Sequence, residues 1–188
     1  MANHDQEEDD DIAAVHEMNE TGDPKNGERW DAAEEGAELL SEGDNAGAVA
    51  ELERVILADK DNEYALFFLG NAHFEGARFD KAMKAYLEAA RVKPGYLGAL
   101  AGVGHSLRML GKHHEALRVA KQILLKAKDD PDGLHIAGLA HFALGQGHAA
   151  ASYLERFLAT KPEIEAAQEA RGLLDVVRGQ FEQDPDLS

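Results

Sequence analysis

The chain has 188 residues and a formal net charge of −17 at pH 7, with 36 Asp and Glu against 19 Lys and Arg, and no cysteine. The acidic charge disfavours nucleic acid and anionic membrane surfaces as partners, and the lack of cysteine excludes a disulfide, a thiol nucleophile or a thiolate zinc site. No apolar run approaches the roughly 20 residues that span a bilayer, and the amino-terminal residues are acidic where a secretory signal is basic and apolar, so we expect a cytoplasmic protein without membrane insertion.

Residues 1–28 differ in composition from the rest of the chain. They hold ten carboxylates against one lysine and few apolar residues. Such a segment cannot bury enough apolar surface to offset the entropy of ordering it, so we expect an acidic, disordered tail. The short apolar run of Ile12, Ala13, Val15, His16 and Met18 leaves open a transient helix that docks on the protein's own surface.

From residue 29 onward the sequence repeats every 34 residues, with units at 29–62, 63–96, 97–130 and 131–164. Three rows of small residues mark the period: Gly36, Gly70, Gly104 and Gly138; Gly43, Ala77, Gly111 and Gly145; and Ala48, Ala82, Ala116 and Ala150. A period of this length without insertions is typical of stacked helical units.

The sequence pattern of each unit predicts two antiparallel helices joined by a turn. Apolar residues lie three and four positions apart, as in Leu100, Val103 and Leu107, which places them on one helical face. The first row of small residues leaves no side chain where a neighbouring helix comes close. The second row suits a left-handed helix end, and the third lets the following helix pack tightly.

Residues 165–181 predict one further helix. Its apolar stripe includes Ala167, Ala170, Leu174 and Val177, and its other face is charged. A partner-binding helix would show the same pattern, but an open end of a stacked array is costly, which favours a capping helix. Residues 182–188 are expected to be a disordered carboxy terminus.

The pattern is most complete at residues 65–94, ALFFLGNAHFEGARFDKAMKAYLEAARVKP. It resembles the tetratricopeptide repeat over residues 29–164. The resemblance implies an all-α fold, a right-handed α-solenoid of four helix–turn–helix repeats with the capping helix at its end. It also implies a concave groove built from the first helix of every unit.

By the period, the side chains that face this groove include several aromatic and polar residues: Trp30, Tyr64, Phe67, Asn71, Phe74, His105, Arg108, His135 and Phe142. Exposed apolar and aromatic surfaces are typical of protein-binding sites. Asn71 fits the groove asparagine of the family, whose amide both donates to and accepts from the backbone of a bound peptide.

The groove departs from the family members that hold a carboxy-terminal carboxylate with lysines and arginines. Ala33 stands where the lysine of the first unit is expected and Ala37 where its asparagine is expected, while Ala101 and Gly102 replace basic candidates of the third unit. Arg108 alone is too little for that task. Recognition of an acidic carboxy-terminal tail is therefore disfavoured.

Two groove residues, His105 and His135, project from neighbouring first helices. Two imidazoles without a carboxylate nearby make a poor metal site, so we expect no metal there and a polar contact with a partner instead. The sequence also has none of the nucleotide-binding, metalloprotease or serine-hydrolase motifs. We therefore expect no cofactor and no enzymatic activity.

The sequence predicts a protein–protein interaction scaffold, or adaptor, whose groove binds an extended or helical apolar segment of a partner. Two alternatives remain open. Length, acidity and an apolar groove are similar to those of the small tetratricopeptide chaperones of bacterial type III secretion translocators, which favours a chaperone of a hydrophobic secreted client. The other alternative is a structural scaffold that self-assembles into a homo-oligomer through its ends.

Overall fold

The helices that the 34-residue period predicts are present in the computed structural model, which describes residues 24–183. The elements of that part of the chain are all α-helices: α2 (Pro24–Ser41), α3 (Asn45–Ala58), α4 (Glu63–Glu75), α5 (Phe79–Val92), α6 (Leu97–Met109), α7 (His113–Lys126), α8 (Pro131–Ala143), α9 (Gly147–Ala159) and α10 (Ile164–Gln183). The predicted all-α fold is confirmed. The chain divides into two units, Met1–Pro94 and Gly95–Ser188, and we refer to the described parts, residues 24–94 and 95–183, as unit 1 and unit 2.

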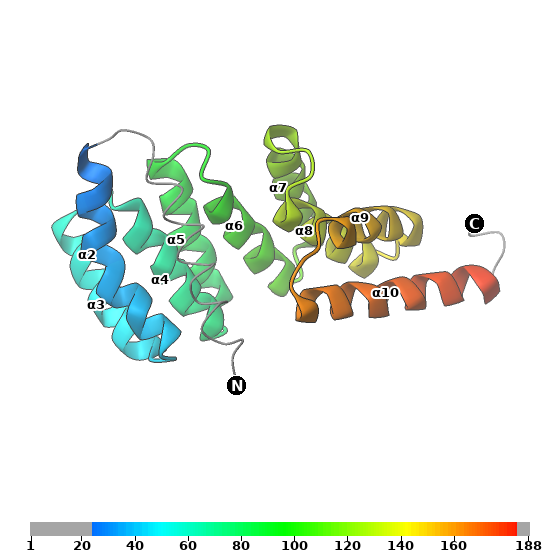
Figure 1. Cartoon of the computed structure of the whole chain (residues 1–188), viewed down its shortest axis with the longest axis horizontal. Helices are drawn as coiled ribbons and strands as arrows, with labels where there is room; N and C mark the ends of the chain where they lie inside the picture. The colour runs from blue at the N-terminus through cyan, green and yellow to red at the C-terminus, as the bar shows by residue number, and fades with distance from the viewer. Residues whose placement is uncertain (1–23, 184–188) are drawn as a thin grey trace. The chain divides into compact units, whose positions relative to one another are not determined.

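Unit 1 consists of two stacked hairpins. Helix α2 packs against α3, and α4 packs against α5, while α2 also lies against α4 (Figure 1). The cluster between them contains Trp30, Leu52, Tyr64 and Phe68, all less than a tenth exposed. Because the first helices adjoin one another, as in an α-solenoid, their side chains form one continuous face.

Side chains placed just before two helices fix where those helices begin. The carboxylate of Asp44 accepts a hydrogen bond from the backbone N–H of Gly47 at 2.9 Å in α3. The amide oxygen of Asn62 accepts one from Ala65 at 2.9 Å in α4, and its amide nitrogen donates to the carbonyl of Arg29 at 2.8 Å. Asn62 therefore both caps α4 and ties it to α2.

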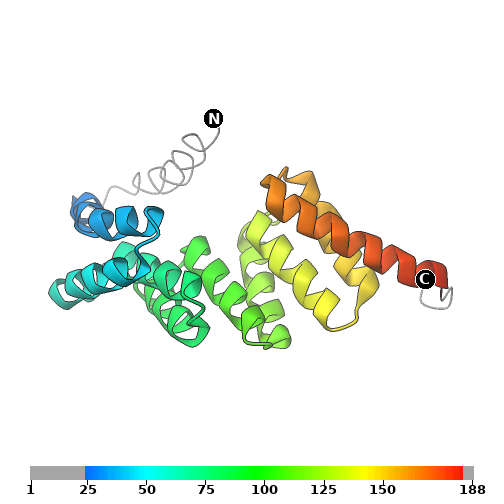
Figure 2. The same ribbon diagram turned by 90° about the horizontal axis from the view of Figure 1, so that it is seen from below.

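Unit 2 repeats the arrangement with α6, α7, α8 and α9 and adds α10. Helix α6 lies against α7 and α8, and α10 packs on α9 (Figures 1 and 2). The core joins α8, α9 and α10 through Leu134, Leu154, Phe157, Ala170 and Leu174. The opposite side of α10 is exposed and mostly polar, so this helix covers an apolar surface without creating another.

The glycines of the first row lie where a large side chain from another helix comes close. A Cβ atom added at Gly70 would be 2.4 Å from the Tyr86 ring, and one at Gly138 would be 2.7 Å from Leu154. Gly104 differs, because the position equivalent to Tyr86 is the small Ala120. There the approaching side chain is Ile136 of α8, at 2.7 Å from the added atom.

The second row forms the predicted left-handed turns between paired helices. Gly43, Gly111 and Gly145 have φ angles of +79°, +73° and +70°. Ala77 occupies the same conformation with φ of +54°, although a Cβ atom makes this region unfavourable by roughly 1–2 kcal/mol. The repeat geometry therefore outweighs the preference of one residue.

The first helix begins earlier than the repeat pattern predicts. Helix α2 starts at Pro24, five residues before the expected start of the first unit at Arg29, so residues 24–28 are helical and not part of a disordered tail. The cause is Asn26, which is buried and accepts a 2.6 Å hydrogen bond from the Tyr64 hydroxyl. The rest of the expected tail, residues 1–23, and residues 184–188 lie outside the described residues.

The last predicted helix also extends beyond its expected bounds. It runs from Ile164 to Gln183, whereas the sequence pattern predicted residues 165–181. None of the helices within residues 24–183 combines the length and apolar character that crossing a membrane requires.

Replacing Gly138 by alanine should lower the free energy of unfolding by about 1–2 kcal/mol. The added methyl overlaps the buried Leu154 side chain, which costs about 1–3 kcal/mol and exceeds the roughly 1 kcal/mol gained in helix propensity. Gly172→Ala is the matched control in unit 2, because no atom lies within 4 Å of its added Cβ. Urea unfolding followed by circular dichroism should show opposite shifts, and equal shifts would contradict the close approach.

Candidate protein-binding faces

The first helices of unit 1 present one face that combines apolar and polar side chains. We call it the unit 1 face and define it by Ala37 and Leu40 of α2 and by Phe67, Asn71 and Phe74 of α4. All five are partly buried. Ala37, Leu40 and Phe67 also pack against the core of the unit, so the face is the outer layer of that core.

Two residues predicted for the groove are part of the core instead. Trp30 is 8% exposed and Tyr64 is 0% exposed. Their rings meet edge to face at 5.3 Å, and Trp30 makes a similar contact with Phe68 at 5.8 Å. The prediction that Trp30 and Tyr64 present their rings to a partner is wrong for this structure, because the contact between α2 and α4 encloses both.

The side-chain amide of Asn71 has its oxygen engaged in a hydrogen bond within the unit. Its Oδ1 accepts a 2.8 Å hydrogen bond from the Tyr86 hydroxyl. Burial raises the pKa of that hydroxyl, so it remains a donor at neutral pH. The Nδ2 group of Asn71 makes no hydrogen bond within residues 24–183, which leaves two N–H donors on the unit 1 face.

The aromatic rings on either side of Asn71 are held by other rings. Phe67 lies 5.6 Å from Phe68 and 5.8 Å from Tyr86, measured between ring centroids. Phe74 lies 5.2 Å from Phe79 at the start of α5. The rings are thus positioned before any partner arrives, which reduces the entropy that binding costs.

The second face lies on α6, α8 and α10. We call it the unit 2 face and define it by His105, Arg108, Asp132, His135, Phe142 and Glu169. The His105 and His135 rings are 5.8 Å apart, and the His135 ring stacks on Phe157 at 4.4 Å with an angle of 8° between the planes. The structure therefore brings together the two predicted histidines. Phe142 follows His135 by two turns of α8 and is partly buried.

Two carboxylates accompany the histidines, contrary to the expectation from the sequence. Asp132 Oδ1 lies 3.8 Å from His105 Nε2, and Glu169 Oε2 lies 3.4 Å from His135 Nε2. The sequence pattern assigned Glu169 to the charged face of the last helix. The 34-residue period could have indicated this placement, because Glu169 follows His135 by 34 residues and so occupies the equivalent position.

Burial and neighbouring charges determine the protonation of this group. Burial, with help from His105 and Arg108, lowers the pKa of His135 to about 4, against the opposing effect of Glu169 and Asp132. The interaction with His105 holds the pKa of Asp132 below its ordinary value. At neutral pH the face therefore combines a neutral His135 with the Arg108 cation and two carboxylates.

Two polar atoms of this face make no hydrogen bond inside the described structure, although Glu169 lies near one of them. Arg108 Nε and His135 Nε2 are buried and make no hydrogen bond within the described part of the chain. Burial also lowers the pKa of Arg108, as expected for a cation with poor access to water. Across residues 24–183, no group of three or more His, Cys, Asp or Glu is arranged to hold a metal ion.

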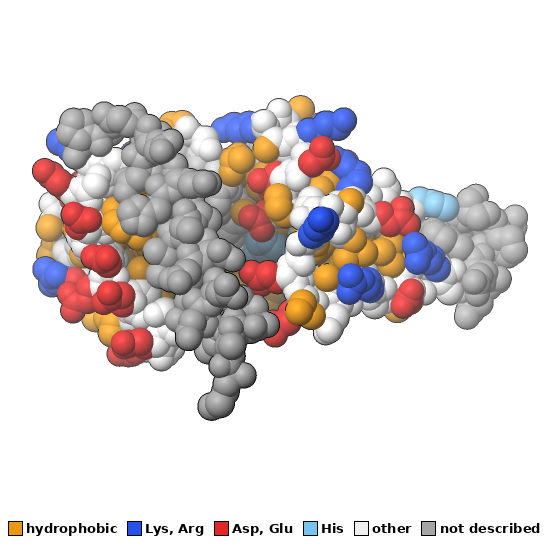
Figure 3. Space-filling model, in the orientation of Figure 1, with side chains coloured by type: hydrophobic (Ala, Val, Ile, Leu, Met, Phe, Trp, Pro, Cys, Tyr) orange, Lys and Arg blue, Asp and Glu red, His pale blue; other side chains and the backbone are white. Residues whose placement is uncertain are grey.

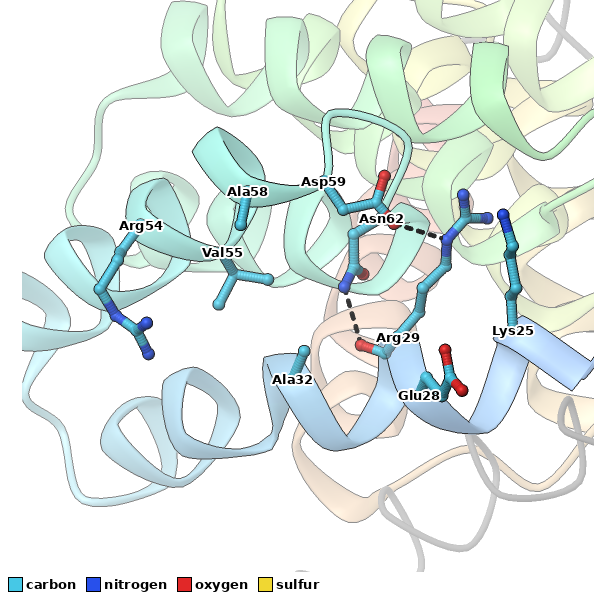
Figure 4. Close-up of a pocket in the computed structure, with 9 residues that line it drawn as sticks. All are labelled: Lys25, Glu28, Arg29, Ala32, Arg54, Val55, Ala58, Asp59 and Asn62. Atoms are coloured by element: carbon cyan, nitrogen blue, oxygen red, sulfur yellow. Dashed lines mark hydrogen bonds and ion pairs between the residues drawn. The ribbon is translucent and has the colours of Figure 1, made fainter.

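A pocket of about 370 Å³ lies on another side of unit 1 (Figure 4). Several of its polar lining residues, including Arg29, Asp59 and Asn62, make contacts within the unit. Arg29 Nε pairs with Asp59 at 2.8 Å, and Arg29 Nη1 pairs with Glu63 at 3.2 Å. The Asn62 amide bonds the Arg29 carbonyl, as the dashed line in Figure 4 shows. These groups connect α2 to α4. The pocket therefore helps to hold the two helices together, and we do not consider it a candidate functional site.

Acidification should destabilise the chain in a way that depends on His135. Its pKa is 6.5 as an ordinary group and about 4 when folded, so the unfolded chain binds more protons between those values. The contribution of His135 to the free energy of unfolding is therefore complete above pH 6.5. It should fall by up to about 3 kcal/mol as the pH decreases toward 4. Urea unfolding at several pH values measures this loss, and His135→Gln should flatten it.

The exposed residue His114 provides the control for that measurement. His114→Gln changes the same type of side chain at the start of α7 without touching the unit 2 face. It should retain the slope of the unmodified chain between pH 4 and pH 6.5. Identical slopes for all three proteins would show that His135 is not the group responsible.

Comparisons with known proteins agree with the repeat. A family model described as a tetratricopeptide repeat matches residues 39–102. Human superkiller complex protein 3 is 25% identical over 127 residues, which are 68% of this chain and 8% of that protein. Tetratricopeptide repeat protein 37 of Xenopus laevis is 24% identical over 118 residues, 63% of this chain and 8% of that protein. The chain thus spans 8% of the length of both curated relatives.

Solved structures show a similar fold. MamA from Desulfovibrio magneticus RS-1 matches with a TM-score of 0.65 and 17% identity, over 88% of this chain and 96% of that one. The second tetratricopeptide domain of human RPAP3, solved with an HSP70 peptide, matches with a TM-score of 0.55 and 21% identity, over 59% and 93%. At these identities the likeness concerns the fold alone. The family match over residues 39–102 and the likeness in fold both agree with the 34-residue period, so the chain is similar to tetratricopeptide repeat proteins.

Proposed function

We propose that this chain is a non-enzymatic, cytoplasmic adaptor that holds an extended or helical apolar segment of a partner protein on the unit 1 face. Tetratricopeptide repeats are in general scaffolds for protein–protein interaction. The observation that carries the proposal is the row of Phe67, Asn71 and Phe74 along α4, where two aromatic rings flank an amide that retains its donors.

The chemistry of this row suits a peptide whose sequence is not read at every position. The N–H donors of Asn71 can bond a backbone carbonyl, which every peptide offers. The flanking rings supply apolar contact that is already positioned by Tyr86, Phe68 and Phe79. Because Tyr86 engages the Asn71 oxygen, we expect the amide to donate to the partner and not to accept from it.

The unit 2 face adds a polar contact of its own. Arg108 Nε and His135 Nε2 are buried without a hydrogen bond in the described chain, and unsatisfied buried polar atoms are costly. A movement of these side chains toward a polar group of the partner would remove that cost. Phe142, two turns along α8, would receive an apolar side chain, so this face suits a segment with one polar and one apolar contact.

The RPAP3 domain indicates what this fold can bind. Its structure contains an HSP70 peptide, whereas the present chain has Ala33 in place of the first-unit lysine and Ala37 in place of the asparagine that would hold an acidic tail. Ala33 is fully buried and Ala37 partly so. This composition supports an apolar segment as the ligand and not an acidic carboxy terminus.

Asn71→Asp should weaken binding of the partner about tenfold. The substitution keeps the oxygen that Tyr86 bonds and removes the two N–H donors, and one hydrogen bond contributes about 0.5–1.5 kcal/mol. Calorimetric titration with the purified partner gives the affinity. Gln122→Glu, at an exposed position of α7, makes the same change from amide to carboxylate and should bind like the unmodified chain. Equal affinity for all three would contradict a donor role for Asn71.

Capture from the native lysate should identify the partner. The unmodified chain, Phe74→Ala, Phe142→Ala and Leu125→Ala are used side by side and read by quantitative mass spectrometry. Leu125 is 77% exposed on α7, so its truncation changes apolar surface outside both faces. A partner held by the faces is reduced by roughly tenfold with at least one phenylalanine variant and retained with Leu125→Ala. Equal recovery with all four proteins would contradict binding at these faces.

A further inference from the structure

The residues that define the unit 1 face carry no charge, although the unit as a whole is acidic. Residues 24–94 contain 15 Asp and Glu against 9 Lys and Arg, and acidic side chains gather over α2 and α3 (Figure 3). The residues that define the face, in contrast, are three apolar types and one amide. A negatively charged segment is therefore repelled less by this face than by the acidic surfaces of unit 1.

The chain itself supplies a segment of matching character. Residues 1–23 contain nine carboxylates and neither Lys nor Arg. Their apolar residues are concentrated at 12–18, where Ile12, Val15 and Met18 recur every three positions and Glu17 is the one charged residue. The flanking carboxylates favour contact with water, whereas these three side chains favour an apolar surface.

The structure fixes the point from which this segment departs. The first two turns of α2 are held by the 2.6 Å bond between Tyr64 and Asn26 and by the pairs of Arg29 with Asp59 and Glu63. The chain preceding Pro24 is thus attached beside the first turn of α4. That point is one end of the unit 1 face.

The length of chain before Pro24 is sufficient to reach the whole face. Residues 12–18 precede Pro24 by six to twelve positions, which corresponds to a span of up to about 20–40 Å. Helix α2, with 18 residues, is about 27 Å long. A short tether of this kind gives an effective concentration in the millimolar range, so a weak apolar contact is enough.

We propose that residues 12–18 bind to the unit 1 face and compete with the partner for it. The contact itself requires only this chain. The competition rests on the proposed function, so a test on the protein alone separates the two. If docking fails, the unit 1 face remains a partner site without a competitor of its own.

Paramagnetic relaxation in the full chain tests the contact. The protein has no cysteine, so Ala14→Cys accepts a single nitroxide label. Amide signals of residues 67–74 in α4 should lose at least half of their intensity, with a weaker effect on α3. The matched control carries the same label together with Ile12→Asp and Val15→Asp, which keeps the tether and removes the apolar contact. Equal broadening with and without the two substitutions would overturn the proposal.

The response to salt distinguishes an apolar contact from an electrostatic one. Both the segment and unit 1 are acidic, so screening of their repulsion should strengthen docking as sodium chloride increases from about 20 to 500 mM. The broadening of residues 67–74 should then increase. A decrease with salt would show that ion pairs with Lys or Arg hold the segment, and it would equally overturn the proposal.

Discussion

The close approach of paired helices at small residues is the constraint on which the structure depends. Gly70 accepts the Tyr86 ring and Gly138 accepts Leu154 at distances that leave no room for a Cβ atom. In the hairpins α2–α3, α4–α5 and α8–α9, a large side chain on the second helix and its absence on the first allow the two helices to approach closely. The positions of every other side chain on the first helices follow from that geometry, including those of the two faces.

The repeat is not uniform, and its departures show which requirement dominates. At Gly104 the mate position is Ala120, and the space is occupied by Ile136 from the next first helix. At Ala77 the turn keeps a left-handed φ of +54° despite the Cβ atom. In both cases the backbone geometry of the repeat is retained. A gap or a locally unfavourable conformation costs a few kcal/mol or less, whereas loss of the hairpin would expose the core of a whole unit.

The two candidate faces differ in how far the sequence alone predicts them. Helical periodicity predicts that Phe67, Asn71 and Phe74 form a row along one side of their helix, but it does not predict the bond from Tyr86 that restricts Asn71 to donating. Trp30 and Tyr64 fit the same periodicity and are nevertheless enclosed between α2 and α4. Periodicity gives the direction of a side chain from its own helix axis and contains no information about what another helix places over it.

The sequence by itself determined the class of structure, the number of hairpins and the positions of the turns, because the 34-residue period and its small residues are local properties of the chain. Tertiary structure decided the rest. Asn26 extends α2 to Pro24 through a hydrogen bond from Tyr64, 38 residues away. Glu169 joins the histidines from a helix beyond the last repeat, and burial there keeps His135 neutral. Such contacts depend on distances between helices, which the order of residues along one helix does not specify.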